Sequence, residues 1–273
     1  METVARCEGI MTAPDPSARG DALARLGFVV ALLIPLAAGV AAWLWGRPWL
    51  VTDTATGIAT WQAWLSGGPW NCLPGPDPTD INRDVTAWVS WWSPGQYVWP
   101  GLFLSLGSSL GAALIVAAVI AAWFRSLGVY LLLRTLTCSP RAAALAVFVE
   151  AANWHLFSSF GMFNGGEVVQ AALLPWLLLG IARLRGRVGW WLFTLPPLLF
   201  AAAFAKHSLF LAALGGLAWL WWETNHRRGS TARGWLGTAA LLIVCGLVAR
   251  WAVQRWIVAG GPTPGDAGQV PHG

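Results

Sequence analysis

The sequence predicts an all-α membrane protein, a polytopic bundle of transmembrane helices with a large extracytoplasmic first loop that carries interfacial helices. Three observations predict this fold class. The chain has 56% hydrophobic and only 11% charged residues, with a mean hydropathy of +0.57, far from the soluble norm. Its apolar residues form continuous runs, which favour helices over a closed barrel. Its arginines gather between those runs, and 273 residues allow about seven spans of ~20 residues.

The net charge of +5 does not indicate a nucleic-acid partner. The basic residues are spread among short segments between apolar runs, where arginine and lysine mark the cytoplasmic side of a membrane protein. The expected partner is therefore the lipid bilayer. Of the four cysteines, only Cys72 falls in an extracytoplasmic loop of the topology below, so no disulfide framework is predicted.

The first span is expected from Leu26 to Trp45, after a loose cytoplasmic tail of residues 1–25. This apolar run is longer than the core of a cleaved signal peptide, so it indicates a retained anchor. A second apolar stretch begins near Trp99 and reaches Phe124, or extends to Leu133. It ends among the basic residues Arg125, Arg134 and Arg141.

A third helix is predicted to start at Ser139-Pro140, because serine is a favoured N-cap and proline suits the first helical position. It runs toward Phe157 and is followed by a second outer loop, residues 158–167. A fourth helix is expected from Val168 to Ile181. The arginines that follow return the chain to the cytoplasmic side; they are Arg183, Arg185 and Arg187.

The run from Trp190 to Trp222 is predicted to be a hairpin of two spans. Both of its ends are basic, so the positive-inside rule requires an even number of crossings. The third outer turn then falls at residues 205–208. A seventh span, from Trp235 to about Ala249, exits outward.

This layout gives a membrane domain of residues 26–258 and a flexible extracytoplasmic tail of residues 259–273. The N-terminus is cytoplasmic, and the helices with their arginine pattern indicate a bacterial-type cytoplasmic, or inner, membrane. An odd number of spans that ends abruptly also fits a truncated relative of a longer protein.

The first outer loop, residues 46–96, contains two candidate interfacial helices. The first has apolar residues at helical spacing, Ile58, Trp61 and Leu65. The second repeats at steps of four, three and four, through Ile81, Val85, Trp88 and Trp92. Asp77 is the expected cap of the second helix, with Pro78 at its first position. Tryptophans on amphipathic helices favour the headgroup layer, so both helices are expected on the membrane surface.

Four features carry a resemblance to a known family: Asp53 after the first span, the stretch WQAWLSGGPWN at 61–71, WWSPGQY at 91–97 and FNGGE at 163–167. Together they resemble the module of GT-C type membrane glycosyltransferases, a superfamily that includes protein O-mannosyltransferases and lipid A aminoarabinose transferases. The resemblance covers about residues 26–258 and implies seven helices with a large first outer loop. It also implies a polyprenyl-phosphate-linked sugar as donor and an acidic residue early in the loop as base or acceptor-orienting group.

The position of that acidic residue matches Asp53. The carboxylate can accept the proton of the acceptor hydroxyl while cations hold the departing phosphate; alternatively, Asp53 caps the helix that starts at Thr54. Glu167 is the second catalytic candidate, as an acceptor-orienting group or a partner of Asp53 in holding a divalent cation. Its structural alternative is a surface carboxylate matched to the helix dipole. No second carboxylate adjoins Asp53 and no Asp-x-Asp occurs in the second loop, so no metal site is predicted.

Four residues are candidate substrate-binding groups: Lys206, His207, Arg250 and His155. Lys206 and His207 at the hairpin tip can grip the donor phosphate, while a lone lysine can instead snorkel to the interface. Arg250 is expected on the same side, where the alternative is an anchoring role. His155 is either part of the active-site rim or a structural histidine.

Glu150 is an intramembrane carboxylate near the middle of the third span, with Asn153 three residues on. Such groups are costly in lipid and indicate function. They open an alternative, a proton-coupled transporter or channel subunit in which Glu150 carries the proton. A non-catalytic membrane scaffold is the remaining alternative. The chain has no metal-binding HExxH motif and no phosphate loop.

Overall fold

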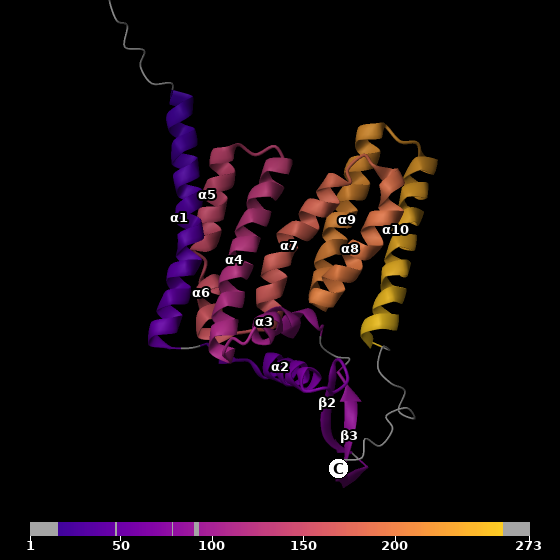
Figure 1. Ribbon diagram of the computed structural model, residues 1–273. Coiled ribbons are helices and arrows are strands. Elements are labelled where there is room, and N and C mark those ends of the chain that lie inside the picture. Colours follow the sequence, from indigo (N-terminus) through magenta and orange to yellow (C-terminus); the bar gives the residue numbers. More distant parts are fainter. Residues whose placement is uncertain (1–15, 47, 78, 90–92, 259–273) are drawn as a thin grey trace, which may run out of the picture.

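The computed structural model describes residues 16–46, 48–77, 79–89 and 93–258, with the backbone alone described at 16–21, 87, 154–156 and 258. The fold is all-α in class, as predicted. Helices run side by side and form the body of the molecule, while shorter elements lie across one end (Figure 1). The expected tail of residues 259–273 and most of residues 1–25 lie outside the described residues.

Seven helices make up the body: α1 (Pro16–Trp45), α4 (Leu110–Thr135), α5 (Pro140–Ala151), α7 (Gly165–Arg183), α8 (Trp191–Ala205), α9 (His207–Arg228) and α10 (Ala232–Val253). Among the described residues, five segments are long and apolar enough to cross a membrane: Ala22–Trp45, Leu110–Thr135, Gly165–Arg183, Val188–Ala205 and Ala232–Ile257. These five segments are compatible with an integral membrane protein. The other two helices fall short because α5 has only 12 residues and α9 ends in the polar sequence ETNHRR.

The first helix starts earlier than predicted. α1 already begins at Pro16, so the last ten residues of the expected loose tail are helical. The apolar stretch that was expected to run on from Trp99 is also broken. It forms α3 (Gly95–Ser105) and then α4, separated by a turn in which Gly107 has φ +84°, a conformation that glycine adopts without strain. The Ser109 side chain caps α4 by accepting from the Ala112 amide.

Arg125 was expected to mark the cytoplasmic end of a span. Because α4 continues to Thr135, Arg125 lies inside the helix instead. The third helix starts as predicted, with the Ser139 side chain accepting from the Ala142 amide and Pro140 at the first position. It ends at Ala151, so Glu150 lies near its C-terminus rather than in the middle of a continuous span.

A second short helix, α6 (Trp154–Gly161), follows α5, and β4 (Met162–Phe163) leads into α7. The segment expected as an outer loop at residues 158–167 is thus largely ordered. β4 pairs in parallel with β1 (Trp49–Leu50), which directly follows α1. This pairing holds the end of α1 beside the start of α7.

The hairpin predicted between Trp190 and Trp222 is present as α8 and α9, and the helices break at Lys206. A 3-10 turn, η1 (Val188–Trp190), precedes α8, and a π-helical turn, η2 (Gln254–Val258), follows α10. Trp191 is fully buried among α7, α8, α9 and α10. α7 is central to the fold because Val169 packs into this core and Val168 into a second one with α4 and α6.

The segment between α1 and α3 contains one of the two predicted helices. α2 (Thr52–Leu65) is the first of them. The second helix prediction is wrong: its residues form β3 (Asp80–Trp88), which pairs antiparallel with β2 (Cys72–Asp77). Trp92 lies outside the described residues.

The spacing itself explains this error. A step of four residues, as between Ile81 and Val85, is compatible with the helical period and also with the strand period of two. Asp77 does not cap a helix. Its carboxylate accepts from the amide and hydroxyl of Thr79 at 2.8 and 2.6 Å, which closes the hairpin turn and lowers the pKa of Asp77.

The tryptophans of the 61–71 stretch form a packed cluster rather than a simple surface belt. Trp61, Trp64 and Trp70 meet edge to face, with ring centroids 5.0 to 5.9 Å apart. Trp61 is 4% exposed, and its ring lies where a Cβ at Gly101 would come within 2.5 Å. The close approach of α2 and α3 therefore depends on a glycine at this crossing.

Candidate functional site

The starts of α2, α3 and α7 meet the end of α8 at one end of the bundle, and we call this place the four-helix junction. It consists of Thr54, Gln96, Gly165, Gly166, Glu167 and Lys206. The Gly165 amide donates to the buried Thr54 hydroxyl at 2.9 Å. A Cβ at Gly165 would lie 2.1 Å from the Gln96 carbonyl oxygen, so the backbones of α3 and α7 are in direct contact here.

The start of α3 also touches the end of α8. A Cβ at Gly95 would come within 2.6 Å of the Ala205 Cα. The SPGQY stretch thus lies between the break at Lys206 and the NGGE stretch at the start of α7. Three of the sequence features that carry the family resemblance therefore meet here. They are SPGQY, NGGE and Asp53, which adjoins Thr54.

Glu167 lies in the first turn of α7, as predicted. The Asn164 side chain caps this helix by accepting from the Glu167 amide at 3.5 Å. Gly166 leaves room for its neighbours, because a Cβ there would lie 3.4 Å from the Lys206 Cε and 3.2 Å from the Gln96 Oε1.

Lys206 and Glu167 form an ion pair, with Nζ and Oε1 2.5 Å apart. The Lys206 side chain is 25% exposed and that of Glu167 is 63% exposed. A second link lies beside it, since the Ser208 hydroxyl donates to the Gln170 Oε1 at 2.8 Å. Sequence reasoning treated Glu167 and Lys206 separately, whereas in the structure Lys206 pairs with Glu167 at the first turn of α7.

Asp53 is exposed and lies in the first turn of α2, whose N-cap position is Val51. The N-cap alternative for Asp53 therefore does not match the structure. Within the described part of the chain, no hydrogen bond or ion pair joins its carboxylate to Glu167 or Lys206. Its neighbour Thr54 links it to the junction.

The remaining substrate-binding candidates are less closely connected to the four-helix junction. His207 is the exposed first residue of α9. Arg250 is exposed in the last turn of α10, a helix that packs against α8 and α9. His155 lies in α6, but its side chain is outside the described part of the structure.

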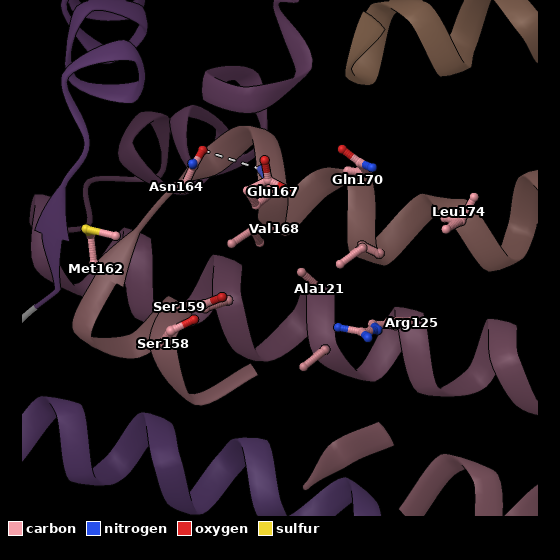
Figure 2. A pocket seen from close by; sticks show the side chains of 14 residues that line it. Ala121, Arg125, Ser158, Ser159, Met162, Asn164, Glu167, Val168, Gln170 and Leu174 are labelled. Atoms are coloured by element: carbon pink, nitrogen blue, oxygen red, sulfur yellow. Dashed lines mark hydrogen bonds between the residues drawn. The ribbon is translucent and has the colours of Figure 1, made fainter. Parts of the chain in front are cut away.

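A cavity of about 400 Å³ opens between α4, α6 and α7, next to the junction. Figure 2 shows Ser158 and Ser159 on one side and Asn164, Glu167 and Gln170 along the opposite helix. Small apolar residues of α4 and α7 complete the wall, among them Ala118, Ala121, Ala122, Ala171 and Ala172.

Arg125 of α4 lines the same cavity (Figure 2). Its Nε forms an ion pair with the Glu150 Oε1, and the two side chains are 20% and 18% exposed. Asn153 lies past the end of α5, in the turn before α6, and its amide donates to the Glu150 carbonyl at 3.1 Å. Glu150 is thus partnered by a cation from another helix.

Sequence reasoning missed Arg125 as a site residue, since an arginine among others read as a topology marker. One signal was available: Arg125 lies within the longer version of the second apolar stretch, which reached Leu133. An ionisable residue inside such a run calls for a partner.

The Tyr97 hydroxyl donates to the Asn71 Oδ1, and the Asn71 side-chain amide donates to the Val89 carbonyl at 2.8 Å. This chain of bonds joins α3 to the segment around the β2–β3 hairpin. Burial raises the pKa of Tyr97, so its hydroxyl keeps the proton that it donates.

The chain matches none of the family models, curated proteins or solved structures with which it was compared. The resemblance to GT-C glycosyltransferases therefore stays a prediction. Among the residues that the structure describes, no three His, Cys, Asp or Glu side chains gather as metal ligands would.

Proposed function

We propose that this protein is a membrane glycosyltransferase of GT-C type that moves a sugar from a polyprenyl-phosphate donor to an acceptor hydroxyl on the extracytoplasmic side. The observation that carries the proposal is the four-helix junction. It sets the helix that bears Asp53 against the start of α7 and next to the ion pair of Lys206 and Glu167. A carboxylate and a cation are the two groups that such a transfer needs.

In the proposed reaction, the acceptor oxygen bonds to the anomeric carbon and its proton passes to the Asp53 carboxylate. The bond from that carbon to the phosphate oxygen breaks, and the lipid phosphate leaves with the electron pair. Lys206 stabilises the departing phosphate, and Glu167 holds the lysine in place. His207 and Arg250 are exposed cations or potential cations that assist from α9 and α10.

The site faces outward in a topology of seven crossings with a cytoplasmic N-terminus in an inner membrane. Support comes from the five apolar segments and from α5 with α6 and α9, which run alongside them (Figure 1). In this topology, the basic ends of α4, α7 and α9 lie on the cytoplasmic side, in agreement with the positive-inside rule.

The test is transfer of labelled sugar from a panel of polyprenyl-phosphate donors in membranes that contain the protein. Asp53→Asn is expected to lower transfer by about 10²-fold or more, in the range of general acid–base catalysis, with the protein level unchanged. The matched control is Asp84→Asn, an exposed aspartate of β3, which is expected to transfer normally. Equal activity of both variants would remove Asp53 as the base.

A second candidate function is proton-coupled transport, and the ion pair of Arg125 and Glu150 beside a cavity is the observation that favours it. Reconstituted vesicles with an imposed pH gradient test this candidate. Proton-coupled flux that Glu150→Gln abolishes, together with no transfer from any donor, would replace the transferase by a transporter.

A further inference from the structure

We propose that the cavity between α4, α6 and α7 binds a phosphodiester monoanion on Arg125, and that Glu150 takes up one proton when the anion binds. The inference concerns binding within the bundle and does not depend on Asp53 or on glycosyl transfer. It rests on the position of the ion pair, the chemistry of the cavity wall and the balance of charge.

Arg125 lies deep in the apolar bundle. At 1.5 Å rise per residue, it is about 22 Å along α4 from the first residue, Leu110, and about 15 Å from the last, Thr135. A helix of this length crosses a hydrocarbon core of ~30 Å, so the guanidinium lies well inside it. A charge there is retained against its cost mainly where it has a partner and a role.

The guanidinium is held from one side and reaches the cavity on the other. The ion pair with Glu150 uses Nε, and Glu150 belongs to α5, which is not part of the cavity wall. The planar guanidinium carries further donors on its two terminal nitrogens, and these match two oxygens of a phosphate.

The rest of the wall suits the same ligand. Ser158 and Ser159 contribute hydroxyls that can donate and accept. Asn164 and Gln170 use their amide oxygens to accept from Glu167 and Ser208, which leaves their amide nitrogens as donors toward a bound group. The alanines of α4 and α7 supply a smooth apolar surface for the substituents of the diester.

Charge balance links the anion to a proton. Arg125 and Glu150 together are neutral, so a bound monoanion would leave a net negative charge in a medium of low dielectric constant. Protonation of Glu150 restores neutrality. Affinity should therefore rise about tenfold for each pH unit of acidification while the empty protein holds Glu150 ionised.

Other charged or titratable groups lie on the elements around this pair. Glu167 lies at the other end of the cavity and is paired with Lys206. Tyr130 and Arg134 lie farther along α4, Arg141 lies in the first turn of α5, and Arg25 lies on α1. His155 belongs to α6, and a histidine can change its charge near neutral pH, so His155→Gln belongs in the test.

The experiment is calorimetric titration of the purified full chain in detergent micelles between pH 5.5 and 7.5, in two buffers that differ in ionisation enthalpy. Two probes separate the sources of the ligand: dimethyl phosphate as a free diester and dihexanoyl phosphatidylglycerol as a lipid-borne one. A diester has no titration of its own in this range, unlike a monoester with a second pKa of about 6. Dihexanoylglycerol is the uncharged control.

The native protein is expected to bind at least one of the two diesters and to take up about one proton per anion. Glu150→Gln should bind more tightly than the native protein at pH 7.5, with no proton uptake and no pH dependence. The double variant Arg125→Gln/Glu150→Gln keeps the site uncharged and should lose binding at least tenfold. Arg134→Gln, an exposed arginine on the same helix, and Asp53→Asn should bind normally.

Three outcomes would overturn the proposal. They are binding of neither diester, unchanged binding by the double variant, or proton uptake that persists in Glu150→Gln and disappears in His155→Gln. Binding that survives in Asp53→Asn while transfer is lost separates this site from the proposed reaction. If the native protein shows no transfer but binds as described, the transferase fails and the anion site stands.

Discussion

Two ion pairs of the same chemical type lie in very different surroundings. At the four-helix junction, Glu167 is 63% exposed beside Lys206, whereas the side chains of Arg125 and Glu150 are each 20% exposed or less, within the bundle. Water screens the first pair, so its contribution to stability is small and its groups are available to a substrate. The second pair has little such screening, and each partner depends on the other. The same pairing chemistry therefore contributes differently to stability in the two places.

The largest effect is expected from breaking the buried pair on one side. Arg125→Gln leaves Glu150 without its cation, and loss of one partner of a buried pair costs about 3–5 kcal/mol. Thermal or denaturant unfolding in detergent measures this loss. Arg125→Gln/Glu150→Gln should recover most of the stability, because no uncompensated charge is left. A double variant as unstable as the single one would contradict this account.

Gly165→Ala is expected to destabilise the protein by about 1–3 kcal/mol, the range for forced overpacking. The added Cβ would lie 2.1 Å from the Gln96 carbonyl oxygen, so α3 and α7 must move apart at the junction. Unfolding measures the loss, and transfer activity should fall with it. The control is Gly215→Ala in α9, where a Cβ meets nothing within 4 Å, and which should be neutral or slightly stabilising.

Tyr97→Phe tests the link from α3 to the hairpin segment. The change leaves the buried Asn71 Oδ1 without its donor, which costs about 1–2 kcal/mol in unfolding free energy. Trp61→Phe is not a suitable control, because its indole also donates, to Ser105 at 3.2 Å. The control is Phe103→Leu, which lies in α3 like Tyr97 and changes packing alone. A Tyr97→Phe variant as stable as the native protein would show that the hydrogen bond does not stabilise this link.

The smallest effect on stability is expected at the exposed pair. Lys206→Met should change the unfolding free energy by less than about 1 kcal/mol, yet it should abolish transfer if Lys206 holds the departing phosphate. Stability and labelled-sugar transfer are measured on the same preparation. Glu167→Gln serves as the companion variant, since it keeps the lysine and removes its partner. Full transfer by Lys206→Met would place the phosphate elsewhere.

The sequence was sufficient wherever a local signal decided the structure. Apolar runs predicted the long apolar helices, Ser139 with Pro140 predicted the start of α5, and the polar break in a long apolar run predicted the turn at Lys206. Each of these depends on residues within one or two helical turns. The start of α7 near Glu167 followed from the same kind of signal.

The two main errors came from contacts between distant segments. β3 pairs with β2 rather than forming a helix, and the spacing of Ile81 and Val85 fits both structures. Arg125 finds Glu150, 25 residues away on another helix, whereas a single arginine after an apolar run reads as a cytoplasmic marker. The pairing partner, which decides each case, is absent from the local pattern.

By itself, then, the sequence determined the all-α class and the approximate positions of the long apolar helices, because hydrophobic periodicity and capping act over a few residues. Only the tertiary structure decided which polar groups meet. Thr54 and Gly165 are 111 residues apart and share a hydrogen bond, and Arg125 is 25 residues from its partner Glu150. Such contacts form because helix packing excludes water and leaves each polar group to find a partner inside the fold, and no local pattern specifies that partner.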